Sequence, residues 1–277
     1  MLKFTKMQGC GNDYIYINCF EQEVADPAAL AVALSPRHFA VGADGVILIC
    51  PSDVADARMR MFNADGSEGR MCGNGIRCVG KYIYDNGIAH KDTVTVETLS
   101  GIKTLSVTAE NGKAAALTVD MGKADTSPAS LPVLADAPVI NAPLTVGGRT
   151  YNATCVSMGN PHCVIFRDKV ADTDIKPEGI QFETSPLFPE SVNTEFVRVI
   201  GRNELEMRVW ERGSGETFAC GTGACAAAVA AVLCGFCDKG ADITVHLIGG
   251  DLTINYTDER VLMTGPAVTV YDGYIED

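Results

Sequence analysis

The chain has 277 residues, enough for one large domain or two modest ones. A hydrophobic share of 47% can bury a core, while a net charge of −13 argues against a nucleic-acid partner, because phosphate binding needs clustered Lys and Arg. The chain opens without a basic and apolar leader, and no apolar run reaches the ~18–20 residues of a membrane span. We therefore expect a cytoplasmic protein without a membrane partner, whose 11 cysteines stay reduced.

The first half reads as three strands, one main helix and three further strands. Alternating apolar residues and β-branched runs predict the strands, and Asn86-Gly87 is a helix stop signal. The expected strands are 13–20, 45–50, 57–62, 93–98, 102–108 and 114–120, and the expected helix is 74–86.

The second half repeats this order, with a helix that ends before Gly235. A last apolar stretch within 265–277 has no counterpart in the first half and reads as a strand that returns to the first domain. The other expected strands are 163–166, 194–200, 205–210, 242–247, 251–256 and 260–264, and the helix is 222–234.

The two halves align with a constant offset of 148 residues. "MRMFNADGSEGRMCGNG" (59–75) falls on "MRVWERGSGETFACGTG" (207–223) without a gap, and 6 of these 17 positions are identical. The repeat predicts an α+β fold of two pseudo-symmetric β-rich domains, each wrapped around a central helix, with the active site in the cleft between them. We expect one domain to comprise 1–120 plus 266–277, and the other 121–265.

Each half places the motif Cys-Gly-x-Gly directly before its helix, at Cys72 and Cys220. The first N–H groups of a helix lack an internal partner and carry positive potential, so the motif predicts a carboxylate site in which Asn74 and Thr222 act as N-cap residues. The same potential lowers a thiol pKa by at most about 1.5. Two such thiols around one carbon could remove a proton from one face and return one to the other, without a metal or a cofactor.

The chain resembles the diaminopimelate epimerase family over nearly its whole length. The resemblance rests on "KMQGCGNDY", "VGADG", "MFNADGSE", "MCGNGIRC", "SMGNPHCV", "VNTEFV", "WERGSGET", "ACGTGACA" and "GPAVTVYDG". It implies a pyridoxal-phosphate-independent isomerase that interconverts LL- and meso-diaminopimelate in lysine and peptidoglycan-precursor biosynthesis. It also implies a homodimer.

The resemblance assigns roles to particular residues. Catalytic roles fall to Cys72, Cys220, His162 and Glu211, and substrate binding to Asn12, Asn63, Gly73, Asn74, Asn160, Asn193, Glu211, Arg212, Gly221 and Thr222. Arg212 suits a distal carboxylate, because its guanidinium can bind it through two hydrogen bonds. Gly45 is left out of the set, since family members that use this position carry glutamine there.

Two other functions stay open at this point. A proline racemase or hydroxyproline epimerase-type enzyme would also use two cysteines on a duplicated scaffold, but would not need Arg212 and several asparagines. A non-catalytic amino-acid-binding protein would use the amides and not the thiols. "CGFC" (234–237) resembles a redox pair or half a zinc site, but it falls at a helix end, and the nine cysteines outside the two motifs are interpreted as packing residues.

Overall fold

The computed structural model describes residues 1–276, and the chain forms two compact units. Unit 1 comprises Met1–Val119 together with the segment that starts at Thr264, and unit 2 comprises Asp120–Met263. No helix among the described residues is long and apolar enough to cross a membrane. The predicted α+β class, with two pseudo-symmetric β-rich units, is confirmed.

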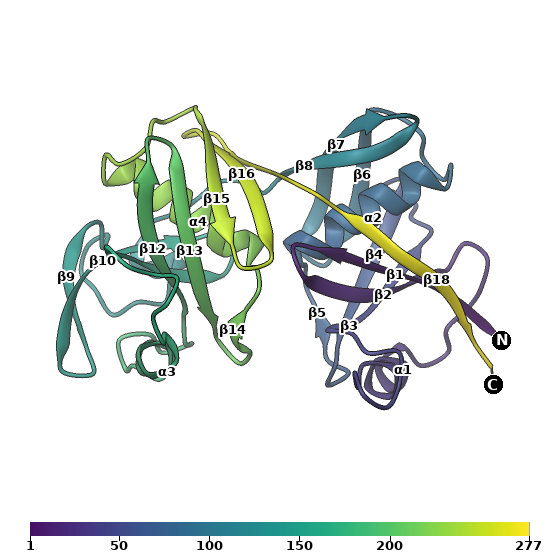
Figure 1. The fold of residues 1–277 in the computed structure, drawn as a ribbon, viewed down its shortest axis with the longest axis horizontal. Helices are drawn as coiled ribbons and strands as arrows, with labels where there is room; N and C mark the ends of the chain where they lie inside the picture. Colours follow the sequence, from purple (N-terminus) through teal and green to yellow (C-terminus); the bar gives the residue numbers. More distant parts are fainter. Residues whose placement is uncertain (277) are drawn as a thin grey trace. The chain divides into compact units, whose positions relative to one another are not determined.

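Unit 1 is a strongly bent set of strands with a helix on each side (Figure 1). Its elements are β1 (Leu2–Gly9), β2 (Asn12–Asn18), α1 (Pro27–Leu34), β3 (Gly45–Cys50), β4 (Ala57–Asn63), β5 (Glu68–Gly69), α2 (Gly73–Asp85), β6 (Thr93–Thr98), β7 (Gly101–Glu110), β8 (Lys113–Asp120) and β18 (Val268–Ile275). Strands β18, β1, β2, β3 and β4 are successive neighbours, and β2 and β3 run parallel. Because β2 and β3 are parallel, both begin at one end of the sheet and finish at the other end.

Side-chain alternation in β2 and β3 divides the core of unit 1 between the two helices. Ile15 and Ile17 pack on the face covered by α1, together with Val46 and Leu48 of β3. The opposite face carries Tyr16, whose hydroxyl donates to a carbonyl of α2. A strand with apolar residues on both faces is buried on both, and this explains the continuous apolar run 45–50.

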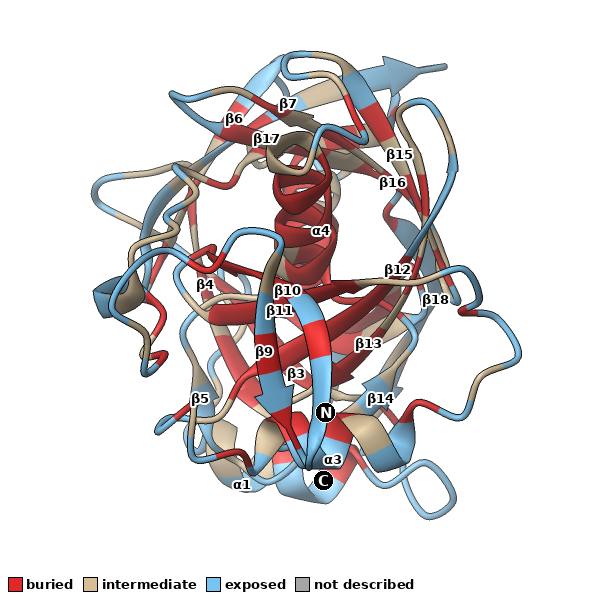
Figure 2. Ribbon diagram, turned by 90° about the vertical axis from the view of Figure 1, so that its left-hand side faces the viewer, coloured by how far each residue is buried: buried red, intermediate tan, exposed pale blue. Residues whose placement is uncertain are grey.

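Unit 2 repeats the arrangement. Its elements are η1 (Pro128–Ser130), β9 (Ala142–Val146), β10 (Arg149–Ser157), β11 (Pro161–Phe166), α3 (Lys176–Glu183), β12 (Asn193–Gly201), β13 (Glu204–Glu211), β14 (Gly215–Thr217), α4 (Gly221–Leu233), β15 (Asp242–Leu247), β16 (Gly250–Tyr256) and β17 (Val261–Gly265). Its central helix α4 is buried along most of its length (Figure 2). Most of its residues are alanine or glycine, which allows the surrounding strands to approach the helix closely.

The 148-residue offset persists in the structure. Helices α2 and α4 begin at positions 73 and 221 and end at 85 and 233, so both bounds differ by 148. The repeated Arg and Glu form the same contact in each unit: Arg60 Nε lies 2.8 Å from Glu68, and Arg208 Nε lies 2.7 Å from Glu216. Each pair joins the two strands that lead into the cysteine motif, so it fixes the approach to the helix.

Eight elements do not follow from the sequence interpretation. Helices α1 and α3 were not expected beside the one main helix of each domain, and the other six are the 3-10 helix η1 and the strands β1, β5, β9, β10 and β14. Helix α1 has an apolar composition with no marked polar face, so it lacks the periodicity that would reveal it. Its start is nevertheless encoded, because Asp26 accepts a hydrogen bond from the Ala29 amide and Pro27 occupies the first turn.

The C-terminal strand β18 pairs antiparallel with β1, so both ends of the chain meet in unit 1 (Figure 1). The buried Arg77 of α2 ties the start of this return segment to the helix. Its guanidinium donates to the carbonyl oxygens of Pro266 and Gly73 at 3.1 Å each, and to Asn74 Oδ1 at 3.1 Å. One side chain therefore connects the first turn of α2 with the start of the return segment.

Replacement of Arg77 by methionine should lower the free energy of unfolding of unit 1 by about 2–4 kcal/mol. The substitution removes the donor of three hydrogen bonds and leaves buried acceptors without a partner. Urea denaturation with hydrogen exchange at α2 measures the effect. Arg58→Met is the matched control: its side chain is 42% exposed and lies 3.8 Å from Glu97, so its loss should cost less than about 1 kcal/mol. Equal losses in both variants would contradict the role of Arg77.

Candidate active site

Cys72 is itself the N-cap of α2. Its backbone is extended, with φ −130° and ψ 120°, and its sulfur accepts a hydrogen bond from the Gly75 amide at 3.3 Å. The expectation that Asn74 caps the helix is wrong, because a residue with helical neighbours on both sides cannot turn its side chain back onto the first amides. The thiol therefore lies directly at the positive end of the helix.

Asn12 holds the thiol of Cys72 from the side of β2. The Cys72 thiol donates to Asn12 Oδ1 at 3.2 Å, and Asn12 Nδ2 donates to Asp44 at 2.7 Å. Arg37 fixes the loop that carries Asp44, because its guanidinium contacts both Asp13 and Asp44. The "VGADG" motif thus positions Asn12, and Asn12 positions the thiol.

Cys220 caps α4 in the same extended conformation, with φ −118° and ψ 111°. Its side chain is more deeply buried than that of Cys72, and the residue is only 6% exposed. Its sulfur lies 3.5 Å from the hydroxyl of Thr222. Thr222 is not the N-cap either, for the same reason as Asn74.

A chain of hydrogen bonds runs from the start of α4 into the sheet. Asn160 Nδ2 donates to Thr222 Oγ1 at 3.2 Å, and the Asn160 Oδ1 accepts from His162 Nε2 at 3.1 Å. The other ring nitrogen of His162 lies 2.7 Å from Glu195, and both residues are completely buried. The structure therefore brings Asn160, His162 and Thr222 together beside Cys220.

Glu195 is the member of this group that the sequence interpretation missed. One carboxylate oxygen contacts His162, while the other, Oε2, has no hydrogen-bond partner among the residues the structure describes. A Cβ on Gly223 would lie 2.7 Å from Glu195 Oε1 and 3.3 Å from the Cys220 sulfur, so the carboxylate lies close to the thiol. The signal was a charged residue two positions after Asn193, which places both side chains on the same face of the strand.

The repeat shows that the two thiols have different surroundings. Glu195 takes the place of Ile47, since 195 − 47 = 148, and a Cβ on Gly75 would meet Ile47 at 2.7 Å. By the same offset Glu211 takes the place of the neutral Asn63. Unit 2 thus carries two carboxylates where unit 1 carries an alkyl group and an amide.

Burial and these carboxylates together reverse the expected effect of the helix on the pKa of Cys220. Burial raises the pKa of the Cys220 thiol well above its usual range, and the negative charges of Glu211 and Glu195 raise it further. The Thr222 hydroxyl and the Gly223 amide favour the thiolate, but they do not compensate. The prediction that the helix end lowers the pKa is therefore wrong for Cys220, because desolvation and like charge outweigh a helix terminus.

The remaining predicted side chains of unit 2 lie around the end of β13, where hydrogen bonds fix them. They are Asn193, Glu211 and Arg212. The Arg212 amide donates to Asn193 Oδ1 at 3.0 Å, and the Arg212 guanidinium donates to the Glu190 carbonyl at 2.8 Å. Glu211 accepts from the Thr217 hydroxyl at 2.5 Å. Glu211 and Arg212 are thus held by separate partners from β12, β14 and the loop before β12.

The glycines and Asn74 can offer a ligand only backbone groups. The Asn74 side chain is buried and accepts a hydrogen bond from Arg77, so it supports the turn from within. Gly73 and Gly221 begin the two helices, where amides have no acceptor within the helix. Asn63 donates from Nδ2 to the Ser67 hydroxyl at 3.0 Å, at the end of β4.

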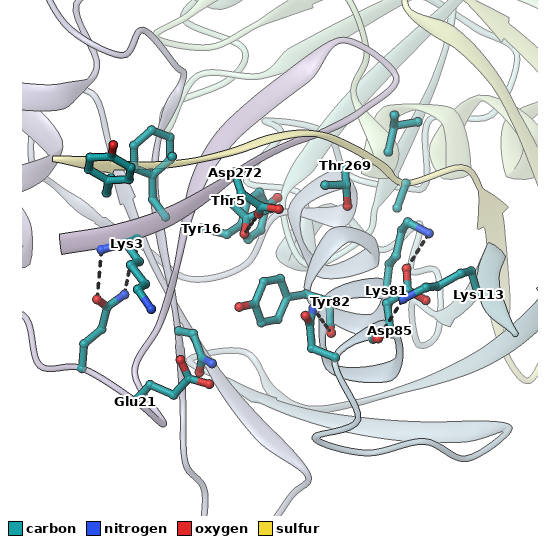
Figure 3. A pocket seen from close by; sticks show the side chains of 18 residues that line it. Lys3, Thr5, Tyr16, Glu21, Lys81, Tyr82, Asp85, Lys113, Thr269 and Asp272 are labelled. Carbon is teal, nitrogen blue, oxygen red and sulfur yellow. Dashed lines mark hydrogen bonds and ion pairs between the residues drawn. The ribbon is translucent and has the colours of Figure 1, made fainter.

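A separate hollow of about 940 Å³ lies in unit 1 and is lined from β1, β2, α2 and β18 (Figure 3). None of the predicted site residues lines it. Lys81 and Asp85 neutralise each other there at 2.8 Å, and the Thr5 hydroxyl donates to Asp272 at 2.6 Å. Among residues 1–276, no group of three or more His, Cys, Asp or Glu side chains is arranged to hold a metal ion.

The chain matches the family model described as diaminopimelate epimerase over residues 4–127 and 154–270. A protein named diaminopimelate epimerase from Desulfovibrio desulfuricans is 53% identical, with 98% of this chain and 97% of that one covered. Proteins of the same name from Acetivibrio thermocellus and Methanococcus maripaludis are 51% identical. They cover 99% of this chain, and 99% and 100% of their own lengths respectively.

Solved structures of lower identity share the fold. A probable proline racemase from Agrobacterium radiobacter gives a TM-score of 0.71 at 15% identity, with 100% of this chain and 93% of that chain covered. A PhzF-family phenazine biosynthesis protein from Bacillus anthracis gives 0.69 at 14% identity, with coverages of 100% and 99%. The same architecture therefore occurs in proteins that carry different names.

Glu211→Gln and Glu195→Gln should each lower the pKa of Cys220, because each removes a negative charge that opposes the thiolate. At a fixed pH below that pKa, alkylation of Cys220 should accelerate, as measured by peptide mass mapping across a pH series. Glu206→Gln is the control from the same strand as Glu211, and it should leave the pH dependence of Cys220 alkylation unchanged. An unaltered profile in both test variants would refute the electrostatic role of the carboxylates.

Proposed function

Because the chain belongs to the diaminopimelate epimerase family, we propose that it interconverts LL- and meso-diaminopimelate by proton transfer between two thiols. The relatives' names support the reaction, and their identity of about 50% extends over the full chain. The observation that carries the thiol mechanism is the placement of a cysteine as the N-cap of the equivalent helix in each unit. Inversion of a stereocentre needs one base and one acid on opposite faces of the carbon.

We assign the base to Cys72 and the acid to Cys220, for substrate entering the resting protein. A thiol flanked by Glu195 and Glu211 retains its proton, as a donor must. Cys72 has Ile47 and Asn63 at the equivalent places, and its sulfur accepts the Gly75 amide, an interaction that strengthens when the sulfur is charged. The sulfur of Cys72 then removes the α-hydrogen, while the Cys220 thiol protonates the carbon.

The first turns of α2 and α4 would bind the carboxylate next to the reacting carbon. Negative charge moves onto this carboxylate when the α-hydrogen leaves, and fixed amide dipoles stabilise charge without reorganising. Gly73 and Asn74 would contribute amides from one helix, and Gly221 and Thr222 from the other. Glycine in these turns leaves the backbone open to the ligand.

His162 would act on the reaction through its neighbours. Its two nitrogens are held by Asn160 and Glu195, so the ring is fixed in orientation beside Thr222 and the start of α4. Glu211 would polarise the Cys220 thiol by its charge. The proposed recognition of the distal amino-acid group uses the Arg212 guanidinium and the polar side chains of Asn12, Asn63, Asn160 and Asn193.

After one turnover the protonation states are reversed, with the proton on Cys72 and the charge on Cys220. The charge on Cys220 is then next to two carboxylates, which favours its rapid reprotonation from water or from substrate. The asymmetry between the units would therefore reset the enzyme. We further propose that the protein works in the cytoplasm as a homodimer in lysine and peptidoglycan-precursor biosynthesis.

Reduced protein in D2O without pyridoxal phosphate should convert LL-diaminopimelate to the meso form and place one deuterium at the inverted carbon. The label comes from solvent because the thiol proton exchanges with water before it reaches the carbon. NMR at the α-carbon and chiral chromatography measure it. Proline is the parallel substrate, and exchange with proline alone would transfer the activity to the racemase class. Exchange with neither would leave an amino-acid-binding role.

Cys72→Ser and Cys220→Ser should each reduce kcat/KM by about 10²–10⁴, the usual contribution of a positioned acid or base. Cys234→Ser is the control, because Cys234 follows α4 as its C-cap and its sulfur contacts the Thr154 hydroxyl at 3.3 Å. Steady-state kinetics on all three variants should leave only the control near wild-type activity. Retained activity in either thiol variant would exclude the two-thiol mechanism.

A further inference from the structure

Two further cysteines of unit 1 lie side by side at the ends of neighbouring strands. Strands β2 and β3 are parallel, with Asn18 paired to Ile49, and the Cys19 amide continues this ladder by donating to the Ile49 carbonyl at 2.8 Å. The next pair along is therefore Cys19 and Cys50. Their side chains are in hydrogen-bonding contact. Both residues are partly exposed to solvent.

This pair is separate from the proposed catalytic thiol. Cys19 continues the face that carries Ile15 and Ile17, on which α1 packs. Cys72 caps α2, which packs against the opposite face of β2 and β3. Asn12, which contacts Cys72, begins β2, whereas Cys19 follows the last residue of this strand. The Cys19–Cys50 pair therefore lies at the opposite end of the strands from Cys72.

Two arginines lie on the same face as the pair. Cys50 is directly opposite Arg58 in the antiparallel β3–β4 pairing, and Arg60 follows at the next position on that face. The hydrogen bond from Cys19 lowers the pKa of Cys50 to about 7 in spite of its burial, and Arg60 and Arg58 contribute in the same direction. The pKa of Cys19 is raised, first by the same hydrogen bond and then by burial. One thiol of the pair is thus a nucleophile and the other keeps its proton.

We propose that Cys19 and Cys50 form a thiol modification site in which Cys50 attacks low-molecular-weight disulfides and Cys19 resolves the product. The geometry is suited to this, because neighbouring strands lie ~4.8 Å apart and a disulfide requires Cα atoms ~4.4–6.8 Å apart. The site does not depend on the proposed epimerase reaction.

The chemistry needs only a disulfide RSSR as co-reactant. The Cys50 thiolate attacks one sulfur of RSSR, forms a mixed disulfide and releases RS⁻. Cys19 then loses its proton to solvent and attacks the Cys50 sulfur, so that a second RS⁻ leaves and the Cys19–Cys50 disulfide forms. The two protein thiols are oxidised by two electrons, and RSSR is reduced to two thiols.

The test uses the reduced full chain carrying Cys72→Ser and Cys220→Ser, treated with an aromatic disulfide that releases a coloured thiolate. At pH 7 about half of a thiol with pKa near 7 is ionised, against roughly 3% of an unperturbed thiol with pKa ~8.5. After correction for its lower nucleophilicity, Cys50 should react about three- to fourfold faster than a cysteine in an unstructured peptide. Peptide mass mapping without reduction should then show the Cys19–Cys50 link, with two coloured thiolates released at this site.

Cys19→Ala in the same background separates reactivity from mere exposure. It should release one coloured thiolate at Cys50, keep the mixed disulfide, and raise the pH at which Cys50 is half reactive, because the donor hydrogen bond is lost. Cys155 and Cys163 are the matched control pair: they are also directly paired on neighbouring strands with their thiols in contact, but they are completely buried. They should stay unmodified in the folded protein.

Two results would overturn the proposal. One is a Cys50 reaction no faster than that of the reference peptide. The other is a mixed disulfide at Cys50 that persists with Cys19 present. Because Cys72 and Cys220 are absent from this background, neither result bears on the epimerase reaction, and a failed epimerase assay does not affect the disulfide mapping.

Discussion

A cysteine that serves as the N-cap of a buried helix is the constraint on which both halves of this protein depend. The cap residue must be extended while the next residue is already helical, and Cys72 and Cys220 meet this condition with nearly the same backbone angles. The sulfur is then held at the end of the helix axis, next to the amides of the first turn. The strand pairs that precede each helix, with their repeated Arg–Glu contact, deliver the chain into this conformation.

Duplication supplied two such caps, and divergence at a few positions made them chemically different. The backbone around them is nearly unchanged, since both helices have the same length and the same offset. The change lies in side chains beneath the caps, where Ile47 and Asn63 correspond to Glu195 and Glu211. In the proposed mechanism a symmetric scaffold carries an asymmetric proton transfer, because burial and the charge of the two carboxylates favour the protonated form of Cys220.

The sequence predicted the strands and helices with a strong apolar pattern, and it missed repeated elements that lack one, such as α1 and its counterpart α3. The strands around 45–50 and 205–210 and both central helices follow from apolar pattern and the 148-residue offset. Helices α1 and α3 escaped because they are short and show no clear apolar stripe. Asn160 and His162 were predicted as site residues by resemblance. Their link to Glu195 was not, because His162 and Glu195 are 33 residues apart and meet only through the pairing of β11 with β12.

The return of the C-terminal strand to unit 1 makes that unit discontinuous, with unit 2 inserted between its two parts. During synthesis, residues 120–263 have all their neighbours as soon as they emerge, whereas β1 can pair with β2 but lacks its second partner, β18, until the last strand is released from the ribosome. Arg77 likewise lacks the Pro266 carbonyl until then. The half that contains Cys72 therefore matures last, and a chain truncated before β18 would contain a finished unit 2 beside an open β1 edge.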